Sequence, residues 1–114
     1  MNIKQITYSN FGRWLELSND IAEVVVTIDI GPRIIRYALC GGKNIMFEDT
    51  DRQLSQNGPE FDAYYNPGDT WYIYGGHRLW TSPEALPRSY YPDNTPVRYE
   101  EIDGGVRFIP DEQK

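Results

Sequence analysis

An alternating segment in the first third of the chain constrains the fold most strongly. Every second residue from 24 to 30 is branched and apolar: Val24, Val26, Ile28 and Ile30. The positions between them are Val25, Thr27 and Asp29. Successive side chains of a strand point to opposite faces of a sheet, so a period of two predicts a half-buried β-strand over residues 24–30.

Turn residues divide the rest of the first half into further short strands. We expect these strands at residues 3–8, 14–17, 34–39 and 45–47. Gly31-Pro32 ends the alternating strand, and residues 40–44 (CGGKN) are typical of a turn. Consecutive strands joined by short turns predict an antiparallel meander.

The second half is less regular. Residues 48–59 are polar and predict a loop, or a single helical turn around residues 52–55. The aromatic run 70–74 (TWYIY) predicts a strand whose rings form core packing or a platform for a sugar. Prolines at 83, 87, 92 and 96 exclude a regular helix and a central strand from residues 83–96. Asp103-Gly104-Gly105 predicts a hairpin between strands at 97–102 and 106–109.

The predicted meander leaves an edge strand and one apolar sheet face without a covering layer. Sheets in water need a second layer or a partner. Two arrangements fit. Either residues 1–114 are a single domain that is the N-terminal portion of a larger β-sandwich, or the sheet curls into a small barrel or pairs with its own copy through the open edge.

Composition excludes several classes of function. The 114 residues include 17 Asp and Glu against 11 Lys and Arg, a net charge of −6. An acidic chain without a basic cluster is not expected to bind nucleic acid or an anionic membrane surface. One cysteine, Cys40, and one histidine, His77, cannot form a disulfide or a structural zinc site, and we expect no metal or cofactor. The N-terminus has no signal-peptide core, which predicts a cytoplasmic protein, although a chain trimmed of its signal would look the same.

The strongest candidate for a binding site is the segment 75–80 (GGHRLW). It places His77, Arg78 and Trp80 within four consecutive positions. Arginine donates in a fixed fork, tryptophan offers a stacking face, and histidine moves protons near neutral pH. These residues together predict a site for a polyhydroxylated ligand. In the competing interpretation Trp80 is a core residue, Arg78 belongs to a structural ion pair and His77 is a surface residue.

Four further residues are candidates for ligand binding. Arg33 follows Gly-Pro at a strand break, where it either reaches a ligand or pairs with a nearby carboxylate. Glu84 and Asp93 are the carboxylates that could complete an acid–base pair with His77, and Asn94 follows Asp93 directly. Asp and Asn in a proline-rich loop are, however, more often turn-formers that bond their own backbone.

The order of several motifs resembles the N-terminal part of the galactose mutarotase-like, or aldose epimerase-like, β-supersandwich superfamily. The motifs are WLEL (14–17), the strand 24–30, GPRI (31–34), NIMFE (44–48), GGHRLW (75–80), PE (83–84) and PDN (92–94). The string GGHRLW…PE…PDN is similar to an uncharacterised branch of that superfamily. The resemblance implies an all-β fold of large antiparallel sheets, with a carbohydrate bound in a concave cleft.

The resemblance also implies a chemistry. In the superfamily's enzymes a glutamate takes the proton from the anomeric hydroxyl while a histidine protonates the ring oxygen, which is general acid–base catalysis. Carried over, His77 is the acid or an orienting residue, and Arg78 and Trp80 lie in the cleft. The catalytic glutamate and a further histidine come from the second half of that fold, which residues 1–114 do not contain.

We therefore expect a carbohydrate-binding, mutarotase- or epimerase-like protein that is incomplete in this chain. As an enzyme it would be an aldose 1-epimerase-like isomerase needing residues beyond these 114. The expected partners are a sugar and either the C-terminal remainder of the fold in another chain or a second copy. The alternatives are a non-catalytic sugar-binding member of the same fold and a structural or interaction β-module.

Overall fold

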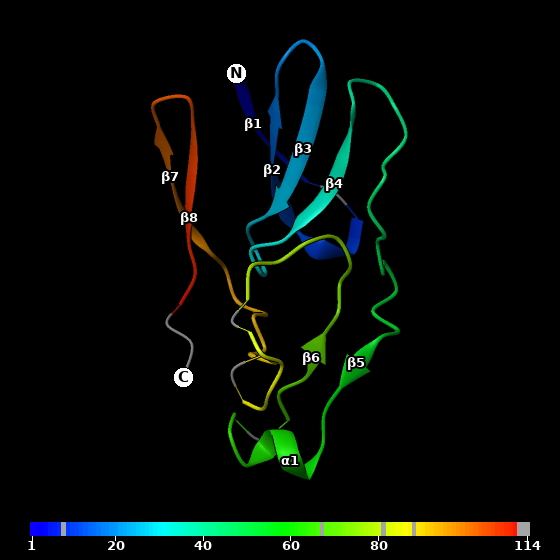
Figure 1. Ribbon diagram of the computed structural model, residues 1–114, viewed down its shortest axis with the longest axis vertical. Helices are drawn as coiled ribbons and strands as arrows, with labels where there is room; N and C mark the ends of the chain where they lie inside the picture. Colours follow the sequence, from blue (N-terminus) through cyan, green and yellow to red (C-terminus); the bar gives the residue numbers. More distant parts are fainter. Residues whose placement is uncertain (8, 67, 81, 88, 112–114) are drawn as a thin grey trace.

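The computed structural model describes residues 1–7, 9–66, 68–80, 82–87 and 89–111. Its elements in chain order are β1 (Asn2–Thr7), the 3₁₀ helix η1 (Ser9–Phe11), β2 (Arg13–Ser18), β3 (Ala22–Thr27), β4 (Ile34–Leu39), β5 (Ser55–Gln56), α1 (Pro59–Asp62), β6 (Trp71–Tyr72), β7 (Arg98–Ile102) and β8 (Gly105–Ile109). The described chain is an all-β assembly of antiparallel sheets with one helical turn of four residues (Figure 1).

Strands β1 to β4 form an antiparallel sheet in sequential order, which confirms the predicted meander. Trp14 in β2 pairs with Ile6 in β1 and with Thr27 in β3. The predicted strand at 34–39 coincides with β4, and the predicted strand at 3–8 matches β1 up to Thr7, since Tyr8 lies outside the described residues. Sequential neighbours pair here because short connections join them.

The alternating strand ends at Thr27 and not at Ile30 as the periodicity predicts. The hydroxyl of Thr27 accepts a hydrogen bond from the Arg33 amide (2.9 Å) and donates one to the Ile30 carbonyl (2.9 Å). This side chain therefore closes a tight loop over residues 28–32 in place of three more strand residues. The register also shifts between Val25 and Val26, and both are buried, so alternation alone did not identify a single buried face.

The predicted strand at 45–47 is wrong. Asn44 precedes it, and its side chain occupies two backbone groups of β4: its oxygen accepts from the Tyr37 amide (3.1 Å), and its nitrogen donates to the Ile35 carbonyl (3.0 Å). A neighbouring strand would need those groups for its own ladder. Residues 45–47 therefore run beside β4 with one backbone bond, from the Ile45 amide to the Tyr37 carbonyl (3.0 Å).

The middle of the chain also differs from expectation. Residues 52–55 form no helical turn, because the Asp49 carboxylate accepts from the amides of Gln53 (3.1 Å) and Leu54 (2.8 Å) and holds an irregular turn. The helical turn lies further along the chain, in α1. Pro59 is its first residue, a position that proline favours. The strand predicted at 70–74 is shorter, since only Trp71 and Tyr72 pair with β5.

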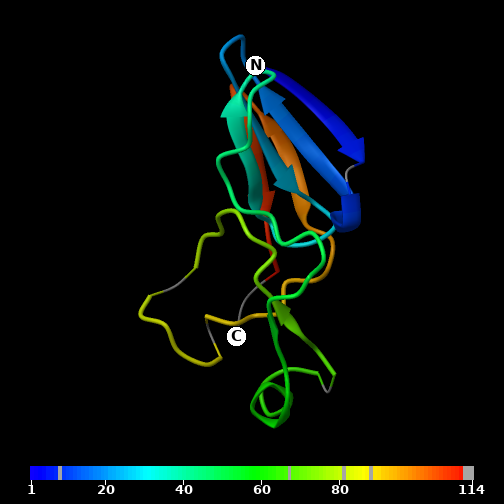
Figure 2. The same cartoon turned by 90° about the vertical axis from the view of Figure 1, so that its right-hand side faces the viewer.

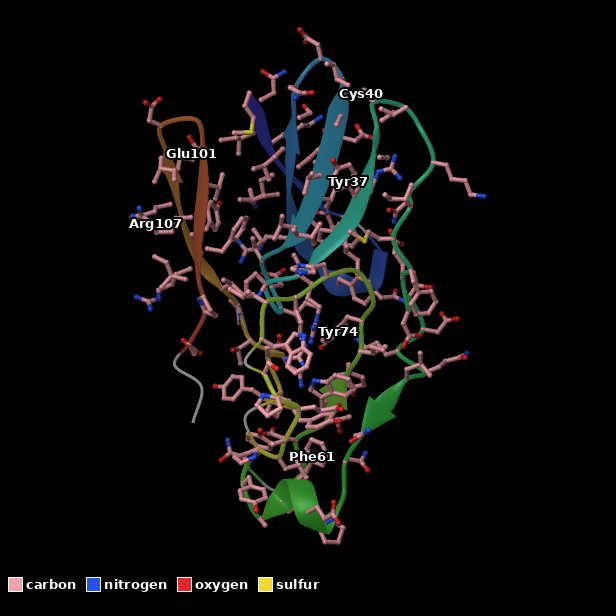
Figure 3. The ribbon with its side chains drawn as sticks, in the orientation of Figure 1. Tyr37, Cys40, Phe61, Tyr74, Glu101 and Arg107 are labelled. Atoms are coloured by element: carbon pink, nitrogen blue, oxygen red, sulfur yellow. The ribbon has the colours of Figure 1, made fainter. Side chains whose placement is uncertain are left out.

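The main core lies where the sheet meets these loops. It is a cluster of buried side chains: Phe11, Trp14, Val25, Ile30, Ile35 and Tyr74. Phe11 stacks on Trp14 (ring centroids 5.8 Å apart) and meets Tyr74 edge-on (5.5 Å). Tyr74 stands near the middle of the molecule, between Cys40 at one end and Phe61 on α1 at the other (Figure 3). The core thus joins the sheet to the segment that carries the candidate site.

The hairpin of β7 and β8 is as predicted, and it lies over one face of the four-stranded sheet (Figure 2). The Tyr99 hydroxyl reaches the side-chain oxygen of Gln5 in β1 (3.3 Å). Val26 and Ile34 from the sheet and Phe108 from β8 line one groove between the two layers. Among the described residues, no helix combines the length and apolar character that crossing a membrane requires.

Candidate functional site

Two glycines fix the path of the GGHRLW segment. Gly75 and Gly76 have φ values of 102° and 62°, which L side chains rarely adopt. A Cβ atom at Gly75 would collide with the Phe47 carbonyl, and one at Gly76 would collide with the Ile34 carbonyl. Beyond them, His77 exchanges backbone hydrogen bonds with Ile34 (2.8 and 2.9 Å). The segment is therefore held against the edge of β4 by main-chain contacts that only glycine allows.

This placement opens a pocket of about 300 Å³ beside the segment. We call it the Trp71–Trp80 pocket. Its walls include side chains from four parts of the chain: Arg33, Phe47, Trp71, Ile73, His77, Arg78 and Trp80. The structure thus brings four of the predicted site residues, Arg33, His77, Arg78 and Trp80, to one pocket.

Arg78 lies between two indole rings. Its guanidinium carbon is 5.7 Å from the ring centre of Trp71 and 5.8 Å from that of Trp80, within cation–π range. One of its terminal nitrogens, Nη2, donates to the Ser89 carbonyl. Burial lowers the pKa of Arg78, although attraction to Asp93 opposes this, and an arginine remains charged at neutral pH. Arg78 is therefore a partly buried cation on an aromatic support.

Arg33 and Asp93 form an ion pair behind the pocket. Their charged atoms are 2.9 Å apart, and the side chains are only 2% and 11% exposed. Arg33 also lies over the ring of Tyr74, 5.2 Å from its centre. Burial lowers the pKa of Arg33 and raises that of Asp93, while their mutual attraction opposes both shifts. Arg33 thus takes the carboxylate partner that its position in the sequence suggested as one of two possibilities.

The other predicted residues do not line this pocket. Asn94 accepts a hydrogen bond from the Tyr74 hydroxyl and donates one to the Thr70 carbonyl (2.7 Å), so it ties the proline-rich loop to the core. Burial raises the pKa of Tyr74 to about 12, so the hydroxyl stays protonated as that donor. Glu84 accepts from the Tyr90 hydroxyl at the surface.

His77 is exposed and borders two hollows. It lines the Trp71–Trp80 pocket and also the apolar groove of about 330 Å³ that reaches Phe108 on β8. In the described part of the chain, no carboxylate lines the Trp71–Trp80 pocket. Of the carboxylates considered as partners of His77, Glu84 is hydrogen-bonded to Tyr90. Asp93 lines the apolar groove together with His77, but its carboxylate is paired with Arg33. These side chains can therefore bind and orient a ligand, but they do not form a complete acid–base pair.

Two contributors were not among the site residues singled out from the sequence. The run that contains Trp71 was expected to form core packing or a sugar platform, and Trp71 forms a wall of the pocket and one face of the support for Arg78. Nothing in the aromatic run 70–74 distinguishes this residue from its neighbours. Ser89 is almost fully buried and supplies the carbonyl that holds Arg78, a backbone role that no side-chain pattern signals.

Among the described residues, no group of three or more His, Cys, Asp or Glu side chains is arranged to hold a metal ion. Comparison of the chain with protein-family models, curated proteins and solved structures gave no match. The resemblance to the galactose mutarotase-like superfamily therefore stays a prediction. What the geometry defines by itself is an open pocket with two indoles, a guanidinium and an imidazole.

Proposed function

We propose that this protein binds a carbohydrate in the Trp71–Trp80 pocket. The observation that carries the proposal is the position of Arg78 between two indoles in an open pocket next to His77. Indole rings stack on the apolar face of a sugar ring, and guanidinium and imidazole groups hydrogen-bond its hydroxyls. A volume of about 300 Å³ is at the lower end for small-molecule sites, which suits a monosaccharide or one end of a longer glycan.

Of sugar binding and catalysis, the described residues support binding. Sugar-ring opening needs an acid and a base at the same substrate. His77 supplies one such group, and no carboxylate of the described chain lines the pocket with it. An aldose 1-epimerase-like activity would therefore depend on a carboxylate that the described residues do not place in this pocket. If the chain alone accelerated anomer exchange in NMR, and His77→Ala abolished the effect, recognition without catalysis would be refuted.

A second candidate is an interaction module. Large apolar side chains in or beside the pocket are exposed, including Leu79 (89%), Phe47 (58%) and Trp80 (44%). Apolar groups gathered on a surface are typical of sites for other proteins. In this alternative the GGHRLW segment serves packing and no sugar binds.

Titration with monosaccharides, followed by tryptophan fluorescence, separates these candidates. We expect saturable binding to the native chain and a loss of roughly tenfold or more in affinity for Trp80→Ala, because a stacking face disappears. Tyr37→Ala is the matched control, since Tyr37 is as exposed (46%) as Trp80 (44%) but lies on β4 away from the pocket (Figure 3). Absence of binding to the native chain, or equal binding by Trp80→Ala, would refute the carbohydrate proposal.

A further inference from the structure

Three side chains that line the Trp71–Trp80 pocket each carry a buried donor without an acceptor. The donors are Nε of Arg33, Nε1 of Trp71 and Nη1 of Arg78, and none of these atoms has a hydrogen-bond partner in the described part of the chain. Buried polar groups in folded proteins are nearly always paired, so three such unpaired groups require an explanation. Since all three are donors, the missing partner is an acceptor.

The contacts of the two arginines at the pocket also favour an acceptor as the ligand. Arg33 and Arg78 are close enough that the charge of Arg78 contributes to lowering the pKa of Arg33. Asp93 interacts with both arginines, but its hydrogen-bonded partner is Arg33 at 2.9 Å. Arg78 instead donates to a neutral carbonyl, that of Ser89. Glu84 also attracts Arg78, but its carboxylate accepts from the Tyr90 hydroxyl. Among the described residues, no carboxylate therefore forms an ion pair with Arg78.

We infer that the sugar bound in this pocket carries a carboxylate, as a uronic acid does, and that Arg78 is the residue that binds this group. The inference rests on the proposed carbohydrate binding and narrows its ligand class. Guanidinium and carboxylate match in charge and in planar geometry. A single guanidinium matches one carboxylate better than a phosphate monoester, which carries close to two charges near neutral pH.

Each residue then has a defined part in binding. Trp80 stacks on the sugar ring, and Arg78 meets the acid group at its edge. Nη1 of Arg78 is shielded in the free protein, so a side chain has to move when the ligand enters. The half-exposed Trp80 lies over this guanidinium, and we expect it to shift. Arg33 is only 2% exposed and acts indirectly, by holding Asp93 away from Arg78.

Matched pairs of ligands test the inference. Methyl β-glucuronide and methyl β-glucoside differ only at C6, as do methyl β-galacturonide and methyl β-galactoside. By calorimetry we expect one acid to bind roughly tenfold or more tighter than its neutral partner, with a preference that weakens as salt screens the charge. Arg78→Gln should reduce the affinity for the acid to that for the neutral sugar, and Arg78→Lys should keep part of the preference. Arg107→Gln, at an exposed arginine of β8, is the control and should bind like the native chain.

The possible results separate the inference from the function on which it rests. Equal affinity for acid and neutral sugar would overturn the inference and leave carbohydrate binding intact. Failure of every sugar to bind would overturn both. A preference for the acid that survives in a folded Arg78→Gln variant would place the charge recognition elsewhere and overturn the role of Arg78. If that variant does not fold, the native chain and Arg78→Lys still decide the question.

Discussion

At the scale of single residues, Trp14 and Trp80 occupy opposite environments. Trp14 is fully buried in the core, whereas Trp80 is 44% exposed. We therefore expect Trp14→Ala to lower the free energy of unfolding by about 3–5 kcal/mol and Trp80→Ala by less than about 1 kcal/mol. Urea denaturation of the two variants measures the difference. A large loss in Trp80→Ala would mean that Trp80 is a packing residue, as the interaction-module alternative requires.

Asp93 neutralises a buried arginine, and its removal should be costly. In Asp93→Asn the size of the side chain is kept, but Arg33 is left as an unpaired buried charge. Breaking a buried pair by removing one partner typically destabilises a protein by about 3–5 kcal/mol. Asp29→Asn is the control, because its partner Arg13 is half-exposed, and we expect a much smaller loss. Similar losses in the two variants on thermal unfolding would contradict the structural role of the Arg33–Asp93 pair.

Asp29 should govern part of the acid sensitivity of the fold. Hydrogen bonds from the Arg13 side chain and amide hold the pKa of Asp29 below its ordinary range. A lowered pKa means that Asp29 stabilises the folded state at neutral pH, and that this contribution is lost as the pH falls below about 4. Asp29→Asn should therefore be less stable than the native chain at pH 7 and lose less stability on acidification. Parallel curves of stability against pH for the two proteins would contradict this assignment.

The residues of the site were only partly predictable from the sequence. His77, Arg78 and Trp80 are adjacent in the chain, so their combined chemistry could be recognised without a structure. Arg33 and Asp93 are separated by 60 positions, and their pairing depends on the loop that Thr27 closes and on the fold of the proline-rich segment. Trp71 was not distinguishable from core aromatics, because only the tertiary fold exposes one of its sides to a pocket.

At the scale of elements, the two glycines before His77 set the position of the site. Gly76 and Gly41 have similar φ values, 62° and 71°, and both are exposed. Gly41→Ala introduces backbone strain alone, since nothing lies within 4 Å of its new Cβ, and should cost about 1–2 kcal/mol. Gly76→Ala adds a collision with the Ile34 carbonyl and should cost clearly more. Equal losses on denaturation would show that residues 76–77 do not dock on β4 as described.

Strand patterns were predictable where nothing competed with the backbone for hydrogen bonds. Period-two alternation and turn residues located β1, β2, β4 and the hairpin of β7 and β8. Prediction failed where a side chain took over backbone groups: Thr27 ends β3 early, Asn44 replaces a strand at 45–47, and Asp49 replaces a helical turn at 52–55. In each case a side chain makes a hydrogen bond that a backbone group would make in a regular element. Which backbone groups the side chain can reach depends on how the fold places the segments.

At the scale of the whole molecule, the described chain is elongated. Its extents are 47, 29 and 26 Å, and its radius of gyration is 14.9 Å, against about 13 Å for a compact domain of this length. Large apolar side chains are exposed at the end of the sheet remote from α1, including Ile21 (70%) and Leu39 (67%). Both the shape and the surface are typical of a chain that associates with another.

We therefore expect self-association at high protein concentration when no other partner is present. Sedimentation velocity over a series of concentrations should show a shift from monomer to a larger species. Charged substitutions at Leu39 and Ile45, which are exposed and outside the Trp71–Trp80 pocket, should reduce that shift. A native chain that remains monomeric at every concentration would argue against an association surface here.

The most direct test of carbohydrate binding is a ¹H–¹⁵N NMR titration of the whole chain with neutral and acidic monosaccharides. The pocket predicts saturable shifts at the amides of Gly75 to Arg78 and at the indole N–H groups of Trp71 and Trp80. The indole of Trp14, buried in the core, should not move. If no sugar produces a saturable shift, or if the shifts lie outside the Trp71–Trp80 pocket, the proposed function is wrong.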